Sequence, residues 1–102
     1  MRLVLVLAAG LLAAGTALAK DPGPGGRLAA ACALCHGSAG RPASAAVSAI
    51  AGMPKSEFVA RMNAFRDGTR PATVMHQIAK GYDAREIELL AAWFAALPKE
   101  AR

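Results

Sequence analysis

The apolar positions of the chain recur at helical spacing, and no segment alternates apolar and polar residues as a β-strand does. Phe58, Met62 and Phe65 stand at positions i, i+4 and i+7, so they predict an amphipathic helix over residues 55–66, with Pro54 in its first turn. The pattern predicts an all-α protein.

Two more helices are expected towards the C-terminus. Residues 73–80 form a short helical stretch. Asp83, with Glu86 three residues later, resembles a capping box. The helix that it starts would run to Leu97, because Pro98 cannot continue it. Its predicted apolar face consists of Ile87, Leu90, Ala91 and Phe94, with Trp93 beside them.

The N-terminal half contributes one helix and its connections. Residues 27–36 are mostly alanine and leucine, which favour helix, and Gly37 is suited to end it. Residues 20–26 are rich in proline and glycine and would form a flexible leader, whereas residues 37–52 lack a long periodic pattern and would form a loop. The sequence thus predicts about four short helices.

The first nineteen residues have the features of a signal peptide. A positive Met1-Arg2 start precedes an apolar stretch from Leu3 to Leu12, and Ala17-Leu18-Ala19 is a small-x-small cleavage pattern. We expect cleavage after this pattern, export to the periplasm, and a single mature domain over residues 20–102 with no membrane span. An uncleaved anchor over residues 3–19 stays open as the alternative, since ~17 apolar residues are the lower limit for a spanning helix.

The chain is mildly basic, with twelve Lys and Arg residues against seven Asp and Glu and a net charge of +5. Cleavage would remove Arg2 and leave +4, spread along the sequence rather than gathered in one basic stretch. Such an excess can steer a protein toward an acidic partner. Nucleic-acid binding is not expected, because no basic stripe with aromatic stacking residues is present.

The segment Cys32-Ala33-Leu34-Cys35-His36 matches the C-x-x-C-H signature of covalent c-type haem attachment. Two thiols three positions apart on one helical turn can each add to a vinyl group of one porphyrin, while the adjoining imidazole reaches the iron. Cys32 and Cys35 are the only cysteines of the chain. We therefore predict one covalently attached haem c, with His36 as the proximal iron ligand. A disulfide between the two cysteines and a partial zinc site are the alternatives.

A second iron ligand is expected among the methionines, since electron-transfer cytochromes commonly use a thioether, which raises the reduction potential. Met62 belongs to the apolar stripe of its helix, and Met53 stands in the loop that follows His36. Met75 lies beyond a helix that can carry the chain around the porphyrin, so we favour it as the distal ligand. His76 competes on chemical grounds, because imidazole binds haem iron well, but as the neighbour of Met75 it would point in another direction.

Further short motifs follow the cysteines: Gly37 and Gly40, then Phe65-Arg66-Asp67-Gly68, Arg70-Pro71, Thr73-Val74-Met75 and Ile78-Ala79-Lys80-Gly81-Tyr82. Together they span nearly all of residues 20–102 and resemble the class I c-type cytochromes, more narrowly the cytochrome subunit of flavocytochrome c sulfide dehydrogenase. The resemblance implies a small class I cytochrome c fold around one haem, in which the first and last helices cross and the haem edge is partly exposed. It also implies that the methionine of the T-V-M motif, Met75, is the distal ligand.

One position departs from that family pattern. Members usually carry a proline in the loop after the haem motif, whose carbonyl accepts the ring N–H of the proximal histidine, and this place falls on Ser48. A serine carbonyl can accept the same bond from a less rigid loop. Some members carry two haems on a duplicated chain, whereas this chain has a single C-x-x-C-H motif and is expected to be monohaem.

With His36 and Met75 both on iron, no position would remain open for a substrate, so an electron carrier rather than an enzyme is expected. The resemblance implies that it accepts electrons from a periplasmic flavoprotein dehydrogenase subunit that oxidises sulfide and delivers them to another cytochrome or other electron acceptor. Arg70, His76 and Lys80 are candidates for docking, although they can equally be ordinary solvated residues. A free-standing cytochrome shuttling between respiratory complexes, a haem enzyme or gas sensor, and a thiol oxidoreductase are the alternatives.

Overall fold

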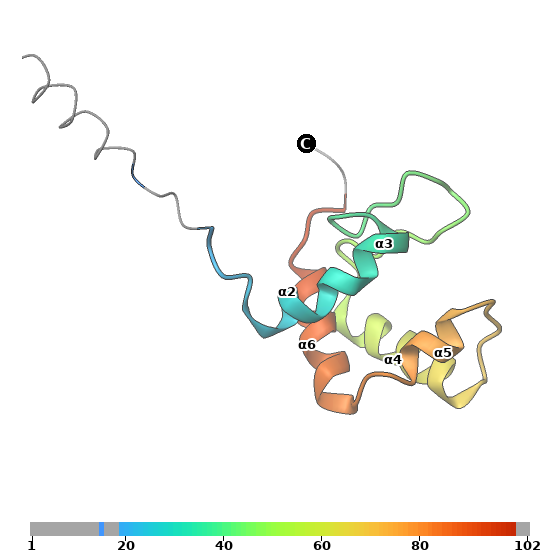
Figure 1. Cartoon of the computed structure of the whole chain (residues 1–102). Helices are drawn as coiled ribbons and strands as arrows, with labels where there is room; N and C mark the ends of the chain where they lie inside the picture. Colours follow the sequence, from blue (N-terminus) through green and yellow to red (C-terminus); the bar gives the residue numbers. More distant parts are fainter. Residues whose placement is uncertain (1–14, 16–18, 100–102) are drawn as a thin grey trace, which may run out of the picture.

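The computed structural model describes residue 15 and residues 19–99. This part of the chain is helical and contains no strand. Its elements are α2 (Gly23–Ala29), the 3-10 helix η2 (Ala30–Cys32), α3 (Ala33–His36), α4 (Lys55–Asp67), α5 (Met75–Ala79) and α6 (Ala84–Ala95). Because α2, η2 and α3 follow one another without a break, the described residues form four helical segments, as the sequence predicts (Figure 1).

The expected signal peptide, residues 1–19, lies outside the described residues except for Gly15 and Ala19. Within residue 15 and residues 19–99, no helix is long and apolar enough to span a membrane.

The first helix begins earlier than the sequence predicts. α2 starts at Gly23, inside the stretch expected to be a flexible leader, with Pro24 in its first turn. Proline suits this place because its φ is already helical and its missing N–H has no partner there in any helix. The Asp21 carboxylate accepts hydrogen bonds from the backbone N–H of Gly23 at 2.8 Å and from Arg27 at 2.7 Å. The prediction of a flexible leader is therefore wrong for residues 23–26.

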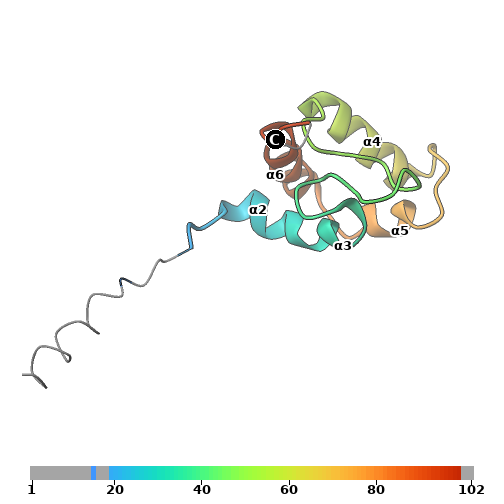
Figure 2. The same cartoon turned by 90° about the horizontal axis from the view of Figure 1, so that it is seen from above.

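Helix α2 packs closely against α6, and the two ribbons cross in both views (Figures 1 and 2). Two glycines of α2 lie at this contact. A Cβ atom on Gly25 would stand 2.6 Å from the carbonyl oxygen of Leu89, and one on Gly26 would stand 2.9 Å from the Trp93 ring. Glycine is needed where two backbones approach this closely. The implied crossing of the first and last helices is confirmed.

Helix α6 contributes four of the nine buried apolar residues in the described part of the chain. Its start is the predicted capping box: the Asp83 carboxylate accepts from the Glu86 backbone N–H at 2.8 Å, and the Glu86 carboxylate accepts from the Asp83 N–H at 3.0 Å. Its four predicted apolar residues are all buried, and their neighbours in the core come from α2, the loop before α4, α4 and α5. The buried apolar residues are Ala29, Ala51, Phe58, Met62, Ala79, Ile87, Leu90, Ala91 and Phe94.

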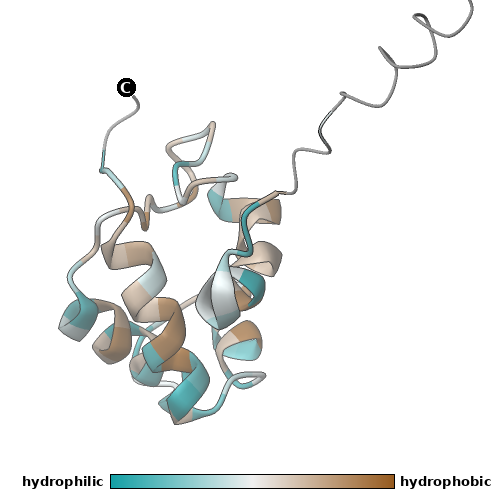
Figure 3. Cartoon of the chain, turned by 90° about the vertical axis from the view of Figure 1, so that its left-hand side faces the viewer, coloured by the Kyte–Doolittle hydropathy of each residue, from teal (hydrophilic) through white to brown (hydrophobic). Residues whose placement is uncertain are grey.

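Helix α4 joins this core through the stripe that the sequence predicts. The rings of Phe58 and Phe94 stack with their centroids 5.6 Å apart, which links α4 to α6. Met62 is buried as well, whereas Phe65 is only partly buried at the edge of the core. Figure 3 shows hydrophobic and hydrophilic residues alternating along the helices, as expected when each helix buries one face.

The glycines of α2 provide a test of the helix crossing. We expect Gly25→Ala to lower the free energy of unfolding by about 1–3 kcal/mol, because the added Cβ overlaps the backbone of α6, which cannot move aside cheaply. Thermal unfolding followed by circular dichroism measures this loss. Gly81→Ala is the matched control, since its Cβ would meet only the Ile78 carbonyl at 3.3 Å. Equal stabilities of the two variants would contradict the close crossing.

Candidate functional site

The cysteine and histidine motif lies where the first helical segment ends. Cys32 is the last residue of η2, and Cys35 and His36 are the last two residues of α3. Gly37 ends the helix with φ 83° and ψ 158°, a backbone conformation that is essentially restricted to glycine. A Cβ atom there would stand 2.1 Å from the Arg41 carbonyl oxygen, so the chain turns back on itself directly after His36.

The loop after this turn is folded back and fastened to the rest of the molecule. The backbone N–H groups of Ile50 and Ala51 donate to the carbonyl of Gly40 at 2.8 and 3.1 Å, which closes the loop at its base. The N–H of Gly52 donates to the Phe94 carbonyl at 2.8 Å and so attaches the loop to the end of α6. Residues 41–49 therefore extend as one closed loop beside α3 (Figure 2).

Ser48, in the second half of that loop, lies beside the ring of His36. The Nδ1 atom of His36 lies 2.6 Å from the backbone carbonyl oxygen of Ser48. A carbonyl oxygen can only accept a hydrogen bond, so Nδ1 donates and holds the ring proton. The other nitrogen, Nε2, then has a free lone pair, the form in which imidazole binds a metal. The sequence-based expectation that the Ser48 carbonyl takes this bond is confirmed.

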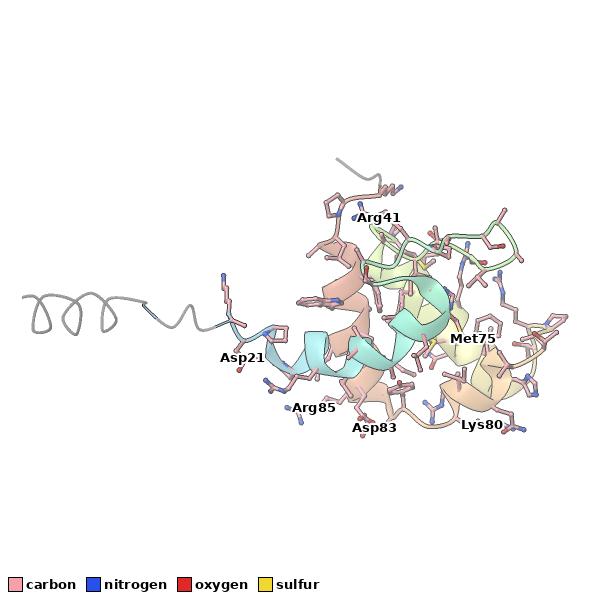
Figure 4. The ribbon with its side chains drawn as sticks, turned by 45° about the horizontal axis from the view of Figure 1, so that its top comes forward. Asp21, Arg41, Met75, Lys80, Asp83 and Arg85 are labelled. Atoms are coloured by element: carbon pink, nitrogen blue, oxygen red, sulfur yellow. The ribbon has the colours of Figure 1, made fainter. Side chains whose placement is uncertain are left out.

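One hollow brings all four predicted site residues together. Its outer part encloses about 1330 Å³ of space open to solvent, and Cys32, Cys35, His36 and Met75 all line it. Its inner part, about 650 Å³, continues toward the core and shares Cys32, His36 and Met75 with the outer part. Figure 4 shows Met75 between the ribbon of α3 and the corner formed by α4 and α5. The T-V-M motif thus reaches the hollow from the side of α5.

Three methionines line the inner part of the hollow: Met53, Met62 and Met75. Met62 is buried within the core cluster, and Met53 packs against that cluster. Only Met75 among them also lines the outer part together with both cysteines. Met75, the first residue of α5, is half-buried and lines the same hollow as His36.

His76 lies in a different place from Met75, as the sequence argument expects. It lines a separate surface hollow, together with Arg66, Arg70 and Lys80, and is absent from the lining of the central one. Its Nδ1 atom is buried without a hydrogen-bond partner. Among the candidates for a second metal ligand, His76 is therefore the one that the fold turns away from His36.

Burial changes the acidity of two groups at the hollow. It raises the pKa of the half-buried Cys32 thiol. It also raises the pKa of the Tyr82 phenol, with smaller contributions from the charges of Cys32 and Glu86. Both groups consequently keep their protons to a higher pH than an exposed thiol or phenol does.

The hollow has lining residues that the sequence argument did not assign to it. Phe58, Arg61, Phe65 and Tyr82 line its inner part, and so does Arg70, which the sequence suggested only for docking. The apolar stripe of α4 could have indicated that Phe58 and Phe65 line the hollow, since the residues of a stripe face one side of the helix. Nothing local in the sequence distinguishes Arg61 from the other basic residues of the chain.

The lining of this hollow fits a covalently attached haem. The inner part is mostly apolar, as the linings of cofactor sites usually are. It presents two free thiols, an imidazole nitrogen with a free lone pair and a thioether. Among the described residues, no group of three or more His, Cys, Asp or Glu side chains is placed to hold a metal ion, so the zinc alternative lacks a ligand set there.

Two known proteins are similar to this chain in sequence. The chain is 37% identical over 73 residues to the cytochrome subunit of sulfide dehydrogenase from Chlorobaculum tepidum, an alignment that covers 72% of this chain and 66% of that protein. It is 36% identical over 67 residues to a thiosulfate dehydrogenase electron acceptor from Stutzerimonas stutzeri, covering 63% of this chain and 31% of that one. The chain thus spans just under two thirds of the length of the first relative and about one third of the length of the second. No protein-family model matches the chain.

The turn after His36 can be tested with two glycines that share a positive φ. We expect Gly68→Ala to cost about 1–2 kcal/mol of stability, because its φ of 76° is strained for alanine but its Cβ has open space. Gly37→Ala should cost more and should weaken the bond from His36 to Ser48, since its Cβ would overlap the Arg41 backbone. Thermal unfolding measures the first effect and the His36 Nδ1–H proton resonance the second. An unaltered resonance in Gly37→Ala would show that this turn does not position Ser48.

Proposed function

We propose that this chain, which is all-α over its described residues and similar to the cytochrome subunit of sulfide dehydrogenase, is a small cytochrome c that acts as a periplasmic one-electron carrier with a single covalently attached haem. The observation that supports this most directly is the convergence of Cys32, Cys35, His36 and Met75 on one hollow, with the ring proton of His36 held on Nδ1 by Ser48.

Each of these residues has a defined part in holding the group. Cys32 and Cys35 would form the two thioether bonds, and their three-residue spacing across the junction of η2 and α3 places both at the outer hollow. His36 would coordinate through Nε2, and Met75 through its sulfur. The bound haem iron supplies reversible one-electron oxidation and reduction. A methionine ligand favours the ferrous state and so raises the potential.

The hollow opens beside a surface suited to a protein partner. Three large apolar side chains are exposed at its rim elements: Leu34 on α3 (91% exposed), Val74 before α5 (49%) and Ile78 on α5 (39%). Arg70 and Lys80 add positive charge on the α5 side, and Lys80 lies at the outer edge of the molecule (Figure 4). We propose that this rim docks on a flavoprotein dehydrogenase, whose flavin performs the substrate chemistry and donates electrons singly.

The localisation and the chain boundaries are part of the same proposal. Residues 1–19 would direct export and be removed, and residues 20–102 would be the mature electron carrier. Export is consistent with the motif, because covalent haem attachment takes place on the outer side of the bacterial inner membrane. The electrons would leave to another cytochrome or other acceptor.

A second candidate is a free-standing carrier that exchanges electrons without a permanent flavoprotein subunit. The relative from Stutzerimonas stutzeri favours it, because that protein is described as an electron acceptor rather than as a subunit. Both candidates use the same haem-binding residues. They differ in how long the carrier stays bound to the dehydrogenase.

Met75→Ala tests the iron ligands. We expect the variant to lose the red-edge sulfur-to-iron absorption band of the ferric protein, to fall in reduction potential, and to bind carbon monoxide in the ferrous state, because a position on iron becomes open. Absorption spectroscopy and potentiometry measure these changes. His76→Ala is the matched control and should keep the band, since His76 lines another hollow. A normal ferric spectrum in Met75→Ala would remove Met75 from the site, and carbon monoxide binding by the unmodified protein would favour a haem enzyme or gas sensor.

Purification of the tagged protein from its native periplasm tests the partner. We expect haem bands, a flavin shoulder and a second, larger polypeptide to elute together, and the N-terminal sequence of the cytochrome chain to start at Lys20. Haem bands on a lone small chain would favour the free-standing carrier. Thiols that alkylate freely and an absence of haem bands would contradict the whole proposal.

A further inference from the structure

Two arginines interrupt the apolar lining of the inner hollow. Arg61 comes from α4, and Arg70 comes from the turn between α4 and α5. No other Lys, Arg, Asp or Glu is among the residues that line this inner part. An anion that enters the hollow would therefore meet these two guanidinium groups.

Both guanidinium groups are held near the hollow by neighbouring side chains. Arg61 forms an ion pair with Glu57, one turn earlier on α4, and its side chain is 36% exposed. That pair engages one of its terminal nitrogens and leaves further N–H donors, because a guanidinium has five. Arg70 lies over the Phe65 ring, 5.4 Å from its centroid, and Phe65 lines the hollow too. Arg70 is exposed as a residue, and the favourable contact between cation and ring stabilises its guanidinium beside the hollow.

The haem proposed for this hollow carries two kinds of substituent with different chemistry. Its vinyl groups react with thiols, and its two propionate carboxylates occupy the part of the porphyrin away from the vinyls. The thiols come from η2 and α3, whereas the arginines come from α4 and the turn after it. Arginine matches a carboxylate with two parallel N–H donors, and such charge-assisted bonds are among the strongest in proteins.

We propose that Arg61 and Arg70 bind the propionate carboxylates of the haem. This inference rests on the proposed function, since it needs a haem in the hollow. The two guanidinium groups compensate negative charge close to the iron, which otherwise favours the ferric state. Glu57 orients Arg61 and opposes its charge, so removal of Glu57 has the opposite effect on the potential from removal of Arg61.

Charge-removing variants of the haem-loaded protein test the proposal. In the double variant Arg61→Gln/Arg70→Gln, we expect the equilibrium between ferrous and ferric protein to shift about tenfold toward ferric, a fall of ~59 mV. Each single variant should shift it in the same direction by less, and Glu57→Gln should shift it toward ferrous. Resonance Raman bands of the propionate groups should move in the arginine variants, an effect that a loss of packing alone does not produce.

Arg66→Gln is the matched control, because it removes the same charge from α4 at a residue outside the central hollow. It should change the equilibrium by less than about twofold, since Arg66 is half-buried at the separate surface hollow and does not line the central one. Arg70→Lys should keep most of the potential but not the propionate bands, because an ammonium cannot form the two parallel bonds. Should the double variant fail to accumulate, the single variants and Arg70→Lys decide the question.

The proposal is overturned if Arg61→Gln and Arg70→Gln match Arg66→Gln in both potential and propionate bands. Its failure is distinct from failure of the proposed function. A pyridine haemochrome assay of the unmodified protein shows whether haem is attached at all, and a positive assay with unmoved propionate bands would leave the electron carrier intact while removing the two arginines from its site.

Discussion

The donor set depends on one hydrogen bond, from Nδ1 of His36 to the carbonyl of Ser48. Without it, the imidazole can rotate and either nitrogen can hold the proton. With it, the proton stays on Nδ1, and Nε2 keeps a free lone pair with which it can act as a base. The acceptor belongs to the backbone, so the bond depends on the path of the loop rather than on the serine side chain. Every feature that fixes this loop therefore acts on the histidine.

The rest of the fold can be understood as support for that loop and for the walls of the hollow. The turn at Gly37 starts the loop, the Gly40 carbonyl closes it, and the bond from Gly52 to Phe94 joins it to α6. Helix α6 in turn holds α2 through the glycine crossing and α4 through the stacked phenylalanines. Both helical walls of the hollow thus pack on one central helix. A small domain with few buried residues can position a site in this way because its contacts converge on α6.

The positions of Met75 and His76 show how a short helix separates two similar ligands. They are neighbours in sequence at the start of α5, yet they line different hollows. Successive residues of a helix point about 100° apart, so only one of them can face His36. A soft thioether rather than a second imidazole then faces the hollow, which suits an electron carrier of raised potential. Large apolar residues are exposed on the elements around this hollow, and the proposed docking uses them.

The sequence by itself determined what depends on neighbouring residues. The thiols and imidazole at fixed spacing, the capping box at Asp83, the apolar faces of α4 and α6, and the end of α3 at Gly37 all follow from local patterns, and the structure contains each of them. The family resemblance added Ser48 as the acceptor for His36, which no local pattern indicates.

Only the tertiary structure decided the features that need two distant segments to meet. Helix α2 extends back to Gly23, because its glycines pack against α6 although their local preference is for a flexible segment. Three methionines reach the inner hollow, and only the arrangement of α5 against α3 and α4 distinguishes Met75 by its access to both cysteines. Arg61 and Arg70 face the same hollow for the same reason. Which way a surface residue points relative to a remote helix depends on packing, and packing is not encoded at any single position.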